Sequence, residues 1–135
     1  MPLFDSAVDG ELGARRKMVI ALVHLKSMPG TPFYQEGDMQ RSIDKALRDV
    51  EALVAGGADG CLLQTVERVY PLGDEADYAR VAGMAAVATA VRRIAPAPFK
   101  IGVQIMWNGI RPSLAVAKTC GGDFVRCAAF VGASE

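Results

Sequence analysis

Five polar residues stand at or near the ends of apolar runs, where the fold could place them for chemistry. Ligands of parallel α/β sheets bind at the carboxyl ends of the strands, so polar side chains that close a strand are candidate site residues. An imidazole can move a proton, a guanidinium can hold an anion, and amides can hydrogen-bond a ligand. The candidate ligand-binding residues are His24, Gln64, Gln104, Asn108 and Arg126.

His24 is the best candidate for a catalytic residue, because an imidazole can act as a general acid or base near neutral pH. Arg126 needs a partner if it is buried, and the sequence offers two: the carboxylate of Glu67 or a bound anion. Each residue also has a purely structural interpretation, since polar residues at strand ends often complete hydrogen-bond networks. The five together indicate either a ligand site or a polar lid over the strand ends.

Metal and cysteine chemistry find little support in the residue pattern. The sequence has 1 histidine and 3 cysteines without C-x-x-C spacing, which gives no strong zinc site and predicts reduced, buried thiols in a cytoplasmic protein. The acidic residues between 67 and 77 could hold a divalent cation, but a solvated loop with a helix cap at Asp77 is favoured. No glycine-rich phosphate motif is present, so no metal is expected and the cofactor is unknown. The cysteines are Cys61, Cys120 and Cys127, and the acidic residues are Glu67, Asp74, Glu75 and Asp77.

Alternating strands and helices must position these residues. Short apolar runs predict buried strands, and apolar residues at helical spacing predict the helices between them. Such alternation forms parallel βαβ units with right-handed crossovers. The predicted strands are 18–23, 60–63, 100–106 and 124–130. The predicted helices follow caps at Asp38 and Asp77 and begin near Pro112, and they end before Gly56, Pro96 and Gly121.

Side-chain alternation separates two faces of the third predicted strand. Gly102, Gln104 and Met106 are assigned to the interior of a barrel, and the residues between them to the side of the helices. A weak repeat of Gly-Gly, Asp and strand, at 55–62 and 120–125, fits the repeated units of a barrel. Any loop from helix to strand can use a glycine cap, so an open sheet remains an alternative.

Length and composition describe one charge-balanced domain. Of 135 residues, 51% are hydrophobic, and 15 Lys and Arg balance 15 Asp and Glu. A disordered chain would have fewer apolar residues and a nucleic-acid-binding chain a basic excess, so neither class fits. Residues 1–17 form a polar segment without a signal-like apolar core, and 18–135 the predicted domain. No run offers the roughly 20 apolar residues that cross a bilayer, so no transmembrane segment is expected.

Three blocks of the sequence resemble the BtpA family. The first and most specific block is Val19–Leu25, followed by Met-Pro-Gly-Thr-Pro-Phe-Tyr at 28–34. The second is Ala55–Leu63, and the third is Gly102–Val131. The resemblance covers nearly all of residues 18–132 and corresponds to the N-terminal half of the family.

The resemblance implies half of a TIM-like (β/α)8 barrel of the ribulose-phosphate-binding kind, with its strands in the order 1-2-3-4. His24, Asn108 and Arg126 fall on positions that match the family. Departures occur where many members carry Glu-Asn and Arg-Asn-Asp, because this chain has Gln64-Thr65 and Trp107-Asn108-Gly109. The missing carboxylates put in doubt any activity that depends on them. A full barrel needs about 250 residues, so the chain is expected to be truncated.

The function that the resemblance implies is biogenesis or stability of a membrane protein complex of the photosystem I type. It implies a protein partner in that complex and a cytoplasmic chain at the periphery of the membrane. The alternative, suggested by the five polar residues, is an enzyme or binder of a small anionic ligand of the sugar-phosphate type. A third interpretation is an open flavodoxin-like sheet, which strand order would distinguish. If the chain is complete, its open strand edges favour a homo-oligomer.

Overall fold

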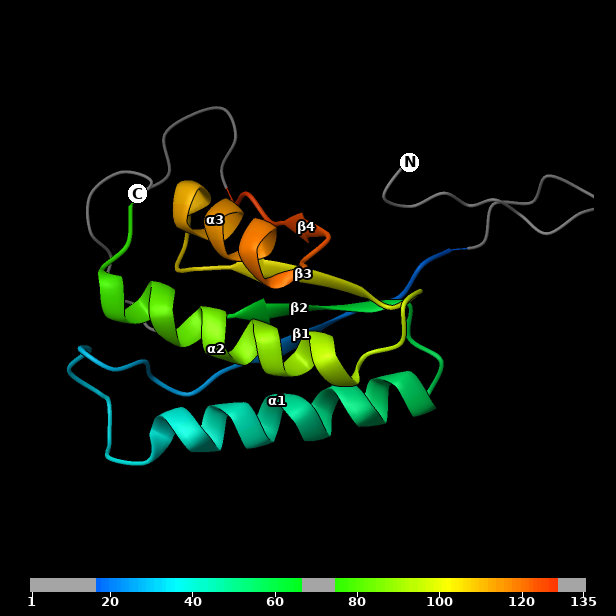
Figure 1. Ribbon diagram of the computed structural model, residues 1–135, viewed down its shortest axis with the longest axis horizontal. Helices are drawn as coiled ribbons and strands as arrows, with labels where there is room; N and C mark the ends of the chain where they lie inside the picture. Colours follow the sequence, from blue (N-terminus) through cyan, green and yellow to red (C-terminus); the bar gives the residue numbers. More distant parts are fainter. Residues whose placement is uncertain (1–16, 67–74, 129–135) are drawn as a thin grey trace, which may run out of the picture.

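Four parallel strands and three helices alternate along the chain (Figure 1). The computed structural model describes residues 17–66 and 75–128. Each strand pairs with the next one in sequence, in the order β1-β2-β3-β4. The elements are β1 (Ile20–His24), α1 (Asp38–Ala55), β2 (Gly60–Gln64), α2 (Tyr78–Ile94), β3 (Lys100–Gln104), α3 (Ile110–Cys120) and β4 (Phe124–Val125).

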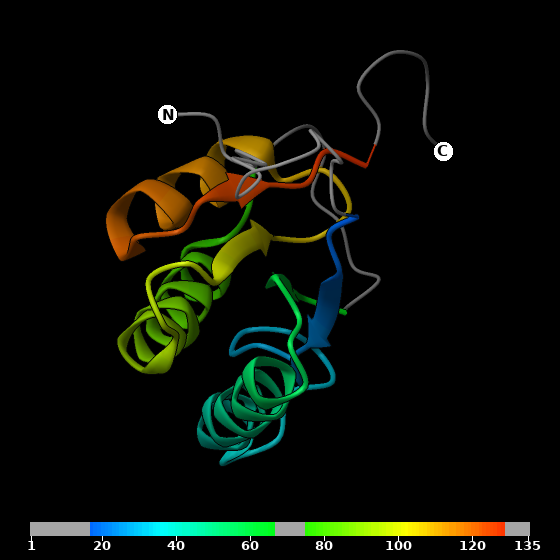
Figure 2. The ribbon, with the colours of Figure 1, turned by 90° about the vertical axis from the view of Figure 1, so that its right-hand side faces the viewer.

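The helices cover one face of the curved sheet and leave its other face open (Figure 2). Val23, Leu63 and Val103 stand in register across three strands and are fully buried in the core that the helices complete. This arrangement of sequential βα units confirms the prediction of half a TIM-like barrel. The flavodoxin-like alternative is wrong, because the described sheet has no reversal of strand order.

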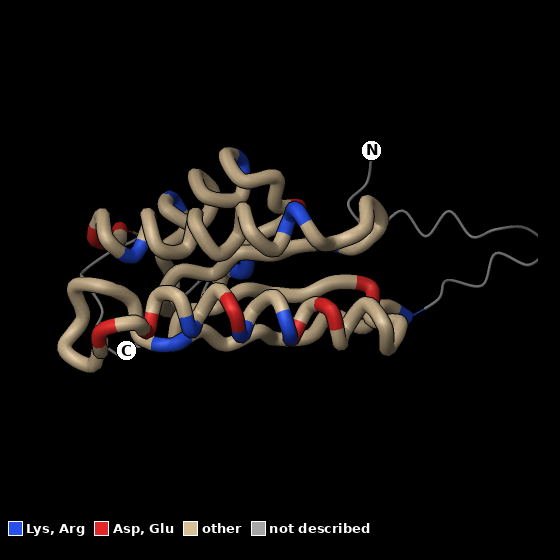
Figure 3. Tube along the Cα trace, turned by 60° about the horizontal axis from the view of Figure 1, so that its bottom comes forward, with Lys and Arg blue, Asp and Glu red and all other residues tan. Residues whose placement is uncertain are grey.

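The helix α1 follows its predicted apolar spacing, but it begins differently from the prediction. Ala46 and Val50 are buried, while charged residues lie along the outer side of the helix (Figure 3). The predicted cap at Asp38 is wrong, because Gly37, with a φ of 84°, occupies the cap position. Asp38 is the first helical residue, and its carboxylate reaches back to accept the Gln35 N–H at 3.0 Å.

The helix α2 begins at its predicted cap. The Asp77 carboxylate accepts a hydrogen bond from the Arg80 N–H at 3.1 Å, so this prediction is confirmed. The glycine predicted to end α3, Gly121, adopts a left-handed φ of 76°, which a glycine reaches without steric cost. Among the described helices, none combines the length and the apolar character that a bilayer crossing requires.

The third strand ends earlier than predicted, at Gln104 rather than Met106. Two hydroxyl groups replace the ladder partners beyond this point. Ser113 Oγ accepts the Ile105 N–H at 2.9 Å, and Thr65 Oγ1 accepts the Met106 N–H at 2.7 Å. Met106 also has a φ of 60°, a left-handed conformation that takes the chain out of the sheet.

The open face of the sheet carries an apolar row below its polar end. Leu22, Leu62 and Gly102 are in register, and Gly102 pairs with Phe124 on β4. The Phe124 ring lies over Gly102, since a Cβ at Gly102 would stand 2.3 Å from the ring. Leu22 is 52% exposed, so this face holds apolar surface that no described element covers. In the described residues β4 ends at Val125, well short of the predicted strand.

The repeated aspartate has the same role at both of its positions. Asp59 Oδ2 accepts the Val19 N–H at 2.8 Å, and Asp123 Oδ2 accepts the Ile101 N–H at 2.9 Å. Each aspartate also donates its own N–H to the carbonyl of the same partner. Each therefore ties the start of its strand to the start of the preceding strand, which explains why the pattern recurs.

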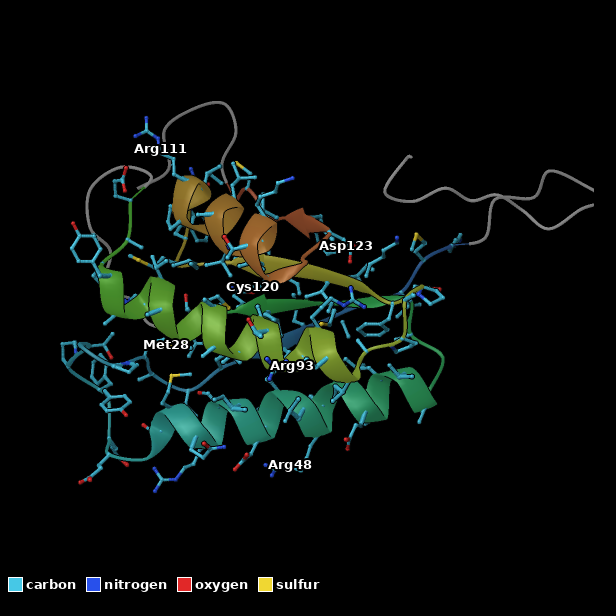
Figure 4. The ribbon with its side chains drawn as sticks, viewed as in Figure 1. Met28, Arg48, Arg93, Arg111, Cys120 and Asp123 are labelled. Carbon is cyan, nitrogen blue, oxygen red and sulfur yellow. The ribbon has the colours of Figure 1, made fainter. Side chains whose placement is uncertain are left out.

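Asp123→Ala is expected to lower the free energy of unfolding by about 1–2 kcal/mol, because the Ile101 N–H loses its acceptor. Asp123 lies beside the start of β3 (Figure 4), and Arg92 Nη1 is 3.4 Å from its carboxylate. Asp123→Asn keeps an acceptor oxygen and is the control, with a smaller expected loss. Urea unfolding followed by circular dichroism measures both variants. Equal losses would show that the ion pair with Arg92 matters more than the backbone bond.

The three thiols differ in their surroundings. Cys61 is buried as predicted, and this burial raises the pKa of its thiol to about 12 despite the nearby charge of Arg92. Cys120 is partly buried, with its Sγ 3.5 Å from the Ala85 carbonyl oxygen. The prediction is wrong for Cys127, which is exposed because it lies beyond the end of β4.

Candidate functional site

The carboxyl ends of β1, β2 and β3 bring three of the five candidate residues into one row. His24 is in register with Gln64, and Gln64 is in register with Gln104. Each stands two residues beyond the apolar row, so all three belong to the open face. We call this set, His24, Gln64 and Gln104, the polar row.

Two amide oxygens of the polar row are buried without a hydrogen-bond partner among the described residues. They are Gln64 Oε1 and Gln104 Oε1. Gln104 is 2% exposed, and its Nε2 donates to the Trp107 carbonyl oxygen at 3.3 Å. The His24 side chain is exposed. The polar row thus combines an accessible imidazole with two buried acceptor oxygens that have no donor among the described residues.

The other two candidates lie at the edge of this arrangement. Asn108 is half-buried in the turn after β3, with its Oδ1 3.4 Å from Cys127 Sγ. Arg126 is exposed and follows the last residue of β4, so its predicted place within a strand is wrong. Its predicted counter-ion, Glu67, lies outside the described residues.

A buried arginine near the end of β3 was missed by the sequence reasoning. Arg80 is 4% exposed, and its Nη1 is 2.9 Å from Met106 Sδ. Its Nε is 3.4 Å from Asp77 Oδ1. A charged residue in the first turn of a helix is usually solvated, so nothing in the sequence signalled its burial.

A cleft of about 480 Å³ opens beside the polar row, next to the end of β1. It shares His24 with the row and is otherwise formed by the segment after β1, the first half of α1 and the end of the β2 segment. This size falls within the range of small-molecule sites. The residues that line it are His24, Leu25, Lys26, Ser27, Phe33, Gln35, Asp38, Lys45 and Val66.

Asp38 contributes a carboxylate to this cleft that is already neutralised. Burial opposes its ionisation, but hydrogen bonds from Arg41 and the Gln35 N–H, together with the charge of Lys26, hold its pKa below the ordinary value of 3.8. Arg41 Nη1 stands 2.9 Å from Asp38 Oδ1. Asp38 is therefore an ion-paired anion in the wall rather than a proton donor.

The two acidic residues after β2 that the structure describes, Glu75 and Asp77, contact other protein groups. Asp77 caps α2, and Glu75 forms an exposed ion pair with Arg111 at 3.2 Å (Figure 4). Glu67 and Asp74 lie outside the described residues. Within the described ranges, no group of three or more His, Cys, Asp or Glu side chains could hold a metal ion.

Comparisons with known proteins extend over most of the chain. An uncharacterised protein of Archaeoglobus fulgidus is 36% identical over 82% of this chain and 43% of its own length. The photosystem I biogenesis protein BtpA of Synechocystis is 29% identical over 84% of this chain and 39% of its own length. The chain thus spans about two fifths of the length of these relatives, and no solved structure matches it. The model of the BtpA family matches residues 15–135, so the chain belongs to the BtpA family.

Proposed function

We propose that this chain binds a small hydroxylated anion of the sugar-phosphate type at the carboxyl ends of β1, β2 and β3. The observation that carries the proposal is the pair of buried, unpartnered amide oxygens in the polar row. A buried acceptor without a donor costs about 1–3 kcal/mol, and a ligand hydroxyl can supply the donor. The accessible imidazole of His24 stands beside these acceptors in the same row.

The residues have distinct proposed roles. Gln64 and Gln104 accept hydrogen bonds from ligand hydroxyl groups. His24 is the candidate for proton transfer if a reaction occurs, since it is the one imidazole of the chain. Asn108 contributes an amide at the turn after β3, and the exposed guanidinium of Arg126 attracts the anionic group.

Ligand-induced thermal shifts with ribose 5-phosphate test this proposal. The wild-type chain is expected to gain thermal stability in a concentration-dependent way. His24→Ala is expected to reduce the shift strongly, and Arg126→Ala is expected to reduce it. Arg48→Ala is the control, because Arg48 lies on α1 and points away from the sheet (Figure 4). Ligand-induced thermal shifts that stay unchanged in both His24→Ala and Arg126→Ala, together with unchanged turnover of any substrate that the wild-type chain converts, would contradict the proposal.

A second candidate function is a role in the biogenesis or stability of a membrane protein complex of the photosystem I type. It is favoured by the likeness to the Synechocystis protein, whose name states such a role. In this proposal the chain is cytoplasmic and attaches to the membrane periphery through a protein partner. Capture on the tagged chain from solubilised membranes should enrich subunits of one membrane complex. Recovery of background proteins alone would count against this role.

We also propose that, in a preparation of this chain alone, a second copy covers the open face. In the described sheet, β1 pairs only with β2, and β4 pairs only with β3. The side chain of Leu22, on the open face of β1, is 52% exposed. Unpaired strand edges and apolar surface of this kind favour symmetric association. Light scattering should give the mass of two chains, and Leu22→Lys should shift the mass towards one. A wild-type monomer with a cooperative melt would contradict this.

A further inference from the structure

The cleft beside β1 has an excess of positive charge once its ion pairs are taken into account. Asp38 pairs with Arg41, and Lys45 pairs with Asp49 on the next turn of α1. The remaining charged side chain in the wall is Lys26, which forms no salt bridge among the described residues and whose charge acts on Asp38. Its backbone is fixed in place, since the Lys26 N–H donates to Ser42 Oγ at 3.0 Å.

The same cleft carries apolar surface at its mouth. Phe33 is 65% exposed and Val66 is 44% exposed, although both are large hydrophobic residues. Their positions on the wall of a cavity, rather than scattered singly over the surface, indicate that a bound group covers them. The wall thus offers a positive excess at Lys26 and an apolar contact within the same space.

We propose that this cleft binds a phosphate monoester, with its anionic end on Lys26 and its apolar or ring portion against Phe33 and Val66. His24 belongs to both the cleft and the polar row, so one ligand can occupy both. The inference rests on the proposed function and deepens it. It adds to that function the place where the phosphate group binds, at Lys26 beside the end of β1, while Arg126 attracts the anion from a distance.

Phenyl phosphate, inorganic phosphate and ribose 5-phosphate are the probes, measured by calorimetry on the full 135-residue chain. Lys26→Met is expected to weaken phenyl phosphate binding by about tenfold, the effect of losing a charge-assisted hydrogen bond. Lys118→Met is the matched control, because Lys118 is an exposed lysine in the last turn of α3 and does not line the cleft. Phe33→Ala should weaken phenyl phosphate but leave the weaker binding of inorganic phosphate unchanged.

The outcomes separate this inference from the proposed function. Equal effects of Lys26→Met and Lys118→Met would overturn the cleft as the phosphate site. If ribose 5-phosphate binding depends on Arg126 and His24 but not on Lys26, the proposed function stands and the inference fails. If Lys26→Met abolishes phenyl phosphate binding while no variant alters ribose 5-phosphate, the anion site stands and the proposed function fails.

A second arm identifies the source of the phosphate. Vesicles that contain phosphatidic acid present the same monoester as a lipid headgroup. Co-sedimentation that Lys26→Met abolishes would support a lipid ligand in this cleft. Binding of phenyl phosphate without co-sedimentation would support a soluble one. Co-sedimentation that survives in Lys26→Met would overturn the cleft as the headgroup site.

Discussion

Gly60→Ala is expected to lose about 3 kcal/mol of folding stability, the upper end of the cost of overpacking a core. A Cβ at this position would stand 2.5 Å from the Lys100 carbonyl oxygen and 2.9 Å from Ile20 Cδ1. The carbonyl cannot swing away as a side chain would, since Gly60 and Lys100 are partners at the start of the β2–β3 pairing. Relief therefore requires the two strands to separate where the sheet begins.

Denaturant unfolding of Gly60→Ala and Gly57→Asn measures this effect against a control from the loop that precedes β2. Gly57 has a φ of 82° and nothing within 4 Å of its Cβ position, and asparagine tolerates this conformation. The control is expected to lose less than about 1 kcal/mol. A loss at Gly60 no larger than that at Gly57 would mean that the strands can separate locally without cost to the remainder of the sheet.

The positions of the elements could be predicted because their signals are local. Asp77 caps α2 and Gly121 ends α3 through contacts with residues a few positions away. The end of β3 could not be predicted in the same way. It depends on the hydroxyls of Ser113 and Thr65, which come from other elements and meet β3 only in the folded chain.

The polar row could be predicted for a similar reason. Alternation along a strand is local, and parallel register then aligns the residues that close neighbouring strands. The cleft could not be predicted, because Lys26 and Phe33 follow β1 in an irregular segment whose path no periodicity describes. Arg126 shows the limit of this reasoning, since it lies within the predicted strand 124–130, while the observed strand ends one residue before it.

Gln104→Leu is expected to change stability and ligand binding in opposite directions. In the free protein its buried Oε1 has no donor among the described residues, and its Nε2 forms only a long bond of 3.3 Å to Trp107. Leucine removes this desolvated acceptor and fills nearly the same volume, so the free energy of unfolding should rise by about 1 kcal/mol. Binding of ribose 5-phosphate should fall by at least about tenfold, because a ligand hydroxyl would face a methyl group.

Thermal melts with and without ribose 5-phosphate measure both effects in one experiment. Gln40→Leu is the control, since Gln40 is an exposed amide on α1 whose Nε2 donates to Asp44 Oδ1 at 2.9 Å. This variant should raise neither the stability of the free protein nor the melting temperature of the ligand-bound protein. A large destabilisation by Gln104→Leu would mean that the amide serves the fold and that its oxygen finds a donor in the free protein. A stabilised variant that no longer responds to the ligand would mean that the chain keeps a costly buried amide for binding. We expect this stabilised, ligand-insensitive variant, because the proposed site uses the buried amide oxygen to accept a hydrogen bond from a ligand hydroxyl group.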